Sequence, residues 1–203
     1  MRKDHSKRVL ITSTSLAFFV PMTSIFAIVF YYGFLMRHVV TYSPYFTVYF
    51  TASFALLACV SALLVHERYG RKQMLKPGWI GMFIANLLIG FGWLYNNVLA
   101  FWGIVLYLAS YNFSVGTLKW VYIAEVSNIN MAAISYFAYW LSCTLIAGIL
   151  PWTKDDNIYL AFFFFALCSL IWLVTVYFLK ETNLPVPDEC SREWFDESFL
   201  NNR

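Results

Sequence analysis

The stretch Glu67–Lys72, which reads ERYGRK, concentrates fixed charges between two long apolar segments. Charged side chains are costly inside a bilayer, so a cluster of this kind belongs at the membrane surface, where water and lipid headgroups solvate it. The stretch therefore predicts a short turn between two membrane-spanning helices, with an apolar span on either side.

The composition is typical of an integral membrane protein. Of the 203 residues, 61% are apolar, 21% are aromatic and 12% are charged, whereas soluble domains carry about 25% charged residues. A hydrocarbon layer of about 30 Å takes about 20 helical residues to cross. Six segments meet this requirement: Ile11–Met36, Tyr45–His66, Pro77–Tyr95, Val98–Ala124, Met131–Leu150 and Ile158–Leu179.

The six segments are predicted to be α-helices, which makes the chain an all-α, polytopic membrane protein. Backbone groups in lipid must bond within their own segment, and these runs are continuously apolar, unlike the alternating strands of a barrel. Pro21 should kink or break the first segment because it lacks a backbone donor. Pro77 is predicted to open the third segment, where a missing donor does no harm, and Gly116 is a weaker candidate kink in the fourth.

The orientation follows from the basic residues of the short loops, which favour the cytoplasmic side. Basic side chains gather in residues 2–8 and 68–76, which share one side if six helices alternate. The other side carries only Arg37 and Lys154. Both termini are therefore predicted to be cytoplasmic, and the net charge of +3 reflects this sidedness and indicates no nucleic-acid partner.

Three parts follow along the chain: a cytoplasmic basic stub at 1–10, a six-helix transmembrane domain at 11–182 and a cytoplasmic acidic and aromatic tail at 183–203. The tail contains Pro185, Pro187 and an aromatic cluster that begins at Trp194. It is interpreted either as a solvated segment with an interfacial aromatic anchor or as a helix that docks onto a partner.

Five motifs, in order, resemble the C-terminal six-helix half of a sugar porter of the major facilitator superfamily. ERYGRK at 67–72 resembles the acidic-R-x-G-R-[RK] turn, and GTLKWVYIAE at 116–125 resembles G-P-x-P-W-x-Y-x-x-E of helix ten. YWLS at 139–142 resembles N-W-x-S of helix eleven, KET at 180–182 resembles P-E-T, and VPDEC at 186–190 stands where the family has T-L-E-E-I.

The resemblance implies a major facilitator half-bundle that transports a small solute, such as a hexose, by alternating access. In that architecture the solute binds between two six-helix halves. A second six-helix half would therefore be a partner, supplied by the same gene, by a separate chain or by a homodimer. The expected host is the plasma membrane.

The polar residues that hold the sugar in the family are replaced here. The Q-Q-x-x-G-x-N motif of helix seven falls on Val20-Pro21 and Phe26, and a register shifted by one residue also yields no amide. The sugar-contacting asparagines of helices eight and eleven fall on Ala55 and Tyr139. These departures leave open a second hypothesis, a non-transporting relative that acts as a membrane sensor or an accessory subunit.

Four residues are candidates for solute binding. Asn112 stands where helix ten of the family often has a sugar-binding Glu, and its amide suits either a hydroxyl-rich ligand or a neighbouring helix. Trp120 matches the helix-ten Trp, whose flat face stacks on a sugar ring or packs in the core. Tyr32 and Trp140 are weaker candidates of the same kind.

The charged turn and an acid at the end of the fourth span could form a cytoplasmic gate. Pairs between them would break and reform as a transporter opens inward, and the family uses these positions in this way. The alternative is a static cluster that only fixes topology. The candidate gate residues are Glu67, Arg68, Gly70, Arg71, Lys72 and Glu125.

Lys119 is unusual because it lies about one and a half turns before Glu125, too deep for an easy exit to the headgroups. A charge at that depth costs several kcal/mol unless it snorkels or finds a partner. Two interpretations remain open: a charge that lines a central cavity and attracts an anionic ligand or an acid of another chain, or a side chain that snorkels to the cytoplasmic surface.

Catalytic and metal-binding patterns are not visible in the sequence. His5, His38 and His66 stand at predicted membrane edges and far apart, and no nucleophile elbow, phosphate loop or metal-ligand spacing occurs. Neither an enzyme activity nor a cofactor is therefore expected.

Overall fold

A computed structural model describes residues 2–39, 43–66, 71–95, 97–152 and 157–178, and every regular element in this part of the chain is a helix. The all-α prediction is confirmed. The elements are α1 Arg2–Phe19, η1 Pro21–Thr23, α2 Ile25–Val39, α3 Pro44–His66, α4 Arg71–Tyr95, α5 Asn97–Ser110, η2 Tyr111–Val115, α6 Gly116–Val126, α7 Ile129–Ile149, η3 Leu150–Trp152 and α8 Ile158–Phe178.

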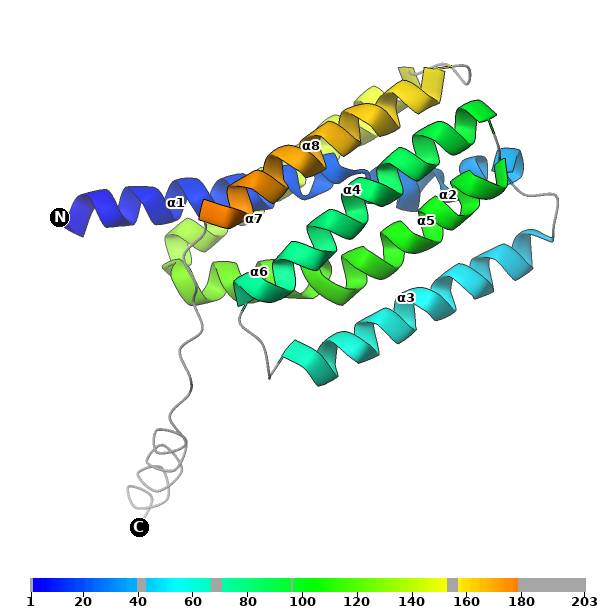
Figure 1. Cartoon of the computed structure of the whole chain (residues 1–203). Helices are drawn as coiled ribbons and strands as arrows, with labels where there is room; N and C mark the ends of the chain where they lie inside the picture. The colour runs from blue at the N-terminus through cyan, green and yellow to red at the C-terminus, as the bar shows by residue number, and fades with distance from the viewer. Residues whose placement is uncertain (1, 40–42, 67–70, 96, 153–156, 179–203) are drawn as a thin grey trace, which may run out of the picture.

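Five helical segments are long and apolar enough to cross a membrane, and they lie close to the second to sixth predicted spans. They are Tyr45–Val65, Gln73–Tyr95, Val98–Glu125, Ile129–Ile149 and Ile158–Val176. In place of the first predicted span stand two shorter apolar helices, Val9–Phe19 and Ile25–Arg37, which follow one another along the bundle (Figure 1).

The first span is interrupted at the proline that the sequence indicated. Pro21 begins the short 3-10 turn η1, and Ser24 after it has φ 83° and ψ −1°. This left-handed conformation costs an L-residue other than glycine roughly 1–2 kcal/mol, so the surrounding structure must stabilise it. The predicted break at Pro21 is confirmed.

Polar side chains of two other helices satisfy the groups at this break. Asn86 of α4, which is 0% exposed, donates from Nδ2 to the Thr23 carbonyl at 3.2 Å and accepts a hydrogen bond from the Ser24 hydroxyl at 2.6 Å. The hydroxyl groups of Tyr107 in α5 and Thr23 are 2.9 Å apart. In a bilayer no water can replace these partners, so α4 and α5 hold the interrupted span in place.

The prediction that Pro77 opens the third span is wrong. Helix α4 begins at Arg71 and continues through Pro77, because Met74 and Leu75 are buried against the core and extend its apolar face. A proline inside a helix removes one backbone donor and disturbs the preceding turn. The Ser114 hydroxyl donates to the Met74 carbonyl in that turn at 2.6 Å, so η2 supplies a polar contact there.

Helix α4 is the central element of the bundle and packs against both α5 and α8. Close approach to α5 depends on small residues: a Cβ atom at Gly92 would collide with the backbone of Ala100. On the α8 side, the rings of Trp79 and Trp172 stack with centroids 5.9 Å apart. These contacts tie the third, fourth and sixth spans into one unit.

Helix α3 stands at one edge of the bundle (Figure 1), where it packs against α5 and η2. Only 11% of its apolar window is buried, compared with 33–44% for the other four long spans. Its exposed apolar side chains include Tyr45, Tyr49 and Leu64. The helix therefore presents most of its surface either to lipid or to another membrane helix.

The hydrogen bonds of Asn86 yield a first prediction. Asn86→Leu should destabilise the protein in detergent or lipid by about 1–3 kcal/mol, because the Thr23 carbonyl and the Ser24 hydroxyl lose their partner inside the bundle. For a chain of this size that corresponds to a fall in unfolding temperature of roughly 2–12 °C. Thermal unfolding followed by circular dichroism would measure it.

The matched control is Thr175→Val, which removes an exposed hydroxyl that bonds only within its own helix, to the Ile171 carbonyl. Its unfolding temperature should stay close to that of the parent chain. Equal stability of the two variants would show that Asn86 does not support the break.

Candidate functional site

Lys119 of α6 is buried in the interior of the bundle, with 2% of its surface exposed. Its ammonium donates a hydrogen bond to the Tyr111 hydroxyl oxygen at 2.7 Å and lies 3.4 Å from the Tyr139 hydroxyl oxygen. Because Tyr111 precedes Lys119 by two turns, the side chain points away from the end of α6. The snorkelling interpretation is therefore wrong, and the charge stays inside.

Three aromatic rings surround the ammonium. The Nζ atom lies 4.5 Å from the ring centroid of Tyr139, 5.2 Å from that of Tyr111 and 5.4 Å from that of Trp120. A cation over an aromatic face gains about 0.5–2 kcal/mol per favourable contact, which offsets part of the desolvation cost. We call Tyr111, Lys119, Trp120 and Tyr139 the Lys119 cage.

A π-helical turn brings the cage together. The segment Tyr111–Val115 is π-helical, and the Gly116 backbone N–H donates to the Tyr111 carbonyl five residues earlier. In a regular helix, Tyr111 and Lys119 would stand about 80° apart around the axis. The extra residue of the π-turn removes most of this difference and places both side chains on one face.

Helix α7 supplies the opposite wall of the cage. Tyr139 packs edge-on against Trp120 at 5.1 Å between centroids and against Phe26 of α2 at 5.8 Å. Trp140 follows it, 48% exposed, and contacts the Tyr139 ring at 5.7 Å. The predicted site residues Trp120 and Trp140 are thus brought to one place, with Tyr139 between them.

The other two predicted binding residues make structural contacts. Asn112 donates from Nδ2 to the Leu108 carbonyl of the preceding turn at 2.8 Å. The Tyr32 hydroxyl donates to the Thr47 carbonyl at 3.0 Å and contacts the Thr51 hydroxyl at 2.9 Å, which connects α2 to α3. None of these hydrogen bonds connects them to the Lys119 cage.

The predicted gate falls mostly outside the described residues. Glu67, Arg68 and Gly70 lie outside them, and so do the side chains of Arg71 and Lys72, whose backbone forms the first turn of α4. Glu125 stands exposed in the last turn of α6. The gate therefore stays a prediction.

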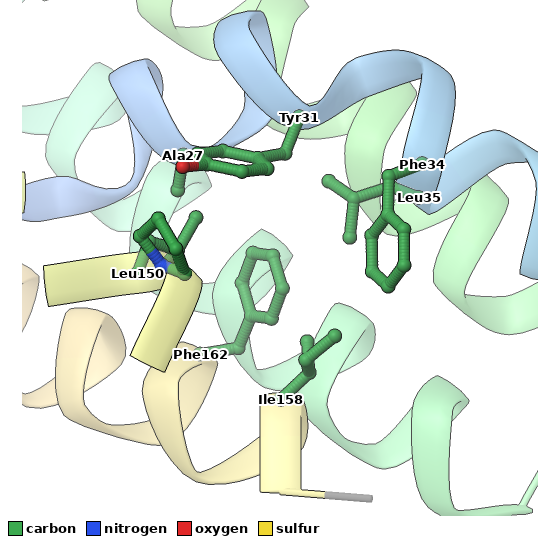
Figure 2. A pocket seen from close by; sticks show the side chains of 8 residues that line it. Ala27, Tyr31, Phe34, Leu35, Leu150, Ile158 and Phe162 are labelled. Atoms are coloured by element: carbon green, nitrogen blue, oxygen red, sulfur yellow. The ribbon is translucent and has the colours of Figure 1, made fainter. Parts of the chain in front are cut away.

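A separate apolar cavity of about 150 Å³ lies between α2, η3 and α8 (Figure 2). Its wall includes Ala27, Leu35, Leu150 and Phe162, together with the ring of Tyr31. No residue of the Lys119 cage lines it, and no charged side chain does so. Among the side chains that line it, only Tyr31 carries a polar group, whereas a hydrophilic solute needs several convergent polar groups to orient it.

Tyr111 was not predicted to be a partner of Lys119. Tyr139 was considered only because it stands where the family has a sugar-contacting asparagine. The signal that could have found Tyr139 was its position directly before Trp140, at a family binding position. Tyr111 could not be found from helical periodicity, because the π-turn changes the register between it and Lys119.

A bundle of apolar helices, five of them long enough to cross a bilayer, is an integral membrane protein. The profile of the family "Sugar (and other) transporter" matches residues 1–194. The chain belongs to this family of sugar transporters.

Curated relatives include two proteins of Arabidopsis thaliana. The chain is 22% identical to Sugar transporter ERD6-like 8 over 169 residues, which is 75% of this chain and 36% of that protein. It is 28% identical to Sugar transporter ERD6-like 11 over 120 residues, 55% of this chain and 24% of that protein. The chain thus spans about a third or less of the length of these relatives.

Solved structures confirm the fold class. A double-tryptophan mutant of XylE superposes with a TM-score of 0.79 at 17% identity, covering 86% of this chain and 40% of that one. The inward open conformation of the xylose transporter XylE from E. coli gives 0.72 at 19% identity, covering 87% and 39%. At these identities the likeness concerns the fold alone.

The environment of Lys119 yields a second prediction. Lys119→Met should raise the unfolding temperature, by about 2–4 °C for each kcal/mol added to the free energy of unfolding. Removing the ammonium abolishes a desolvation cost of several kcal/mol, whereas the two phenols keep their own O–H donors and each lose only one accepted hydrogen bond. Differential scanning fluorimetry of the purified chain measures the shift.

Arg37→Met, which removes an exposed cation from the end of α2, is the control and should change stability by less than about 0.5 kcal/mol. A large fall in stability for Lys119→Met would assign Lys119 a purely structural role.

Proposed function

We propose that this chain is the C-terminal six-helix half of a sugar transporter and moves a hexose or a related small solute by alternating access. The observation that carries the proposal is the family match over residues 1–194. The order of the motifs and the superposition on about 40% of the XylE chain support it. The six-helix domain comprises 11–182, between a basic stub at 1–10 and a tail at 183–203.

The proposed mechanism needs a second six-helix half. In this architecture the solute binds near the bilayer midplane, between two halves related by an axis along the membrane normal. Three sources of the second half fit this geometry: the same gene, a separate chain or a second copy of this chain. The exposed surface of α3 and the exposed rings of Tyr136, Phe137 and Trp140 on α7 are apolar surfaces that another half would cover.

We place both termini in the cytoplasm and the protein in the plasma membrane. The orientation is supported by the basic residues at 2–8 and 68–76, which the positive-inside rule assigns to the cytoplasmic side. Helix α6 ends at Val126 and helix α4 begins at Arg71, and the two helices are in contact. Glu125 and the charged turn would thus face the same membrane surface.

The uptake of labelled sugar tests this proposal. In yeast without its own hexose carriers, expression of the chain should produce saturable uptake of glucose or xylose above that of an empty vector. Cross-linking in the membrane should give a product of about twice the 23.6 kDa of one chain, as expected for paired halves. Correct insertion with neither uptake nor a paired species would exclude transport by a homodimer and assign the second half to another polypeptide segment.

The gate yields a separate prediction. Arg71→Glu should lower the uptake rate about tenfold or more while leaving membrane insertion intact, because it puts like charges together where the gate needs an attractive pair. The double variant Arg71→Glu with Glu125→Arg restores opposite charges and should recover part of the rate. Unchanged uptake in the single variant would remove the gate from the mechanism.

A further inference from the structure

The Lys119 cage encloses a cation that is matched only by neutral groups. In the part of the chain that the structure describes, the ammonium contacts two phenol oxygens and three ring faces, and no carboxylate lies within ion-pair reach of it. A cation in the interior of a membrane bundle is costly without a counter-charge. The described residues therefore supply this ammonium with no counter-charge.

The geometry of the phenols sets where that anion would bind. Lys119 has only N–H donors, so the hydroxyl oxygens of Tyr111 and Tyr139 are the acceptors of its hydrogen bonds. The O–H proton of each phenol is then directed away from the ammonium. The cage thus presents two charge-assisted donors, which suit an acceptor that carries negative charge.

The surroundings of these donors suit a ring-shaped solute. Trp120 is only half-buried, and its indole lies against Tyr139, so part of its face can stack on a sugar ring. Phe26 closes the other edge of Tyr139. A neutral sugar needs acceptors for its hydroxyl groups as well as donors, whereas the cage residues supply an ammonium, two phenols and an indole.

We propose that the Lys119 cage binds the carboxylate of an acidic sugar, with the phenol hydroxyls of Tyr111 and Tyr139 as donors and Trp120 beneath the ring. This inference rests on the proposed function and narrows its substrate class from a neutral hexose to a sugar acid. The ammonium acts behind the phenols as the fixed charge that selects the anion. An acid of the second half that paired with Lys119 would make the site neutral and remove this selectivity.

The experiment compares glucuronate with glucose, which share a ring and differ at one carbon. The full 203-residue chain is placed in nanodiscs of phosphatidylcholine, which has no net charge, and the binding of each sugar is measured by calorimetry. Glucuronate should bind about tenfold or more tightly than glucose, as one charge-assisted interaction provides. In Lys119→Met the two affinities should become nearly equal, and in Tyr139→Phe the ratio should fall in part.

The control is Arg37→Met, which removes an exposed cation outside the cage and should leave the ratio unchanged. Equal affinities in the parent chain, tighter binding of glucose, or an unchanged ratio in Lys119→Met would each overturn the inference. Binding of glucose without discrimination would leave the proposed sugar transport standing. Binding of neither sugar would overturn the inference for this chain, whereas the proposed transport is tested separately by the uptake of labelled sugar.

Discussion

Every polar backbone group of a membrane helix must find its partner inside the protein, and the most demanding place in this fold is the break at Pro21. The interrupted span leaves Thr23 and Ser24 in a non-helical conformation at membrane depth. Asn86 and Tyr107 satisfy them from α4 and α5. These contacts fix where α1 and α2 lie against the bundle, and the packing of α7 on α1 follows from that position.

The same constraint explains the second irregular stretch. The π-turn at Tyr111–Val115 leaves the regular hydrogen-bond ladder and is covered by α3 and α4 on one side and by α6 beyond it. Irregular backbone at membrane depth is tolerated only where it is buried in protein or lines a cavity. Both interruptions therefore belong to the interior, and the Lys119 cage stands directly beside the second one.

Hydropathy and proline were sufficient to predict the helical class, the long spans and the break at Pro21, because these depend on local sums of transfer free energies and on one missing donor. The start of the third span was predicted wrongly at Pro77. Burial of Met74 and Leu75 outweighs the local cost of a proline inside the helix, so the helix begins earlier. The cage was predicted only in part. Lys119 and Trp120 were singled out from the sequence, whereas Tyr111 depends on a one-residue register change that no period reveals.

A degenerate relative that kept only the fold would be most stable with apolar side chains where the sugar amides had been. Phe26 fits that description, but Lys119 does not, since a buried cation costs more than the neutral contacts around it return. The replacement of Asn by Tyr139 also supplies a hydroxyl at the ammonium. A chain that is only a scaffold gains nothing from a buried cation without a counter-charge among the described residues, whereas the proposed selection of an anionic solute depends on that cation.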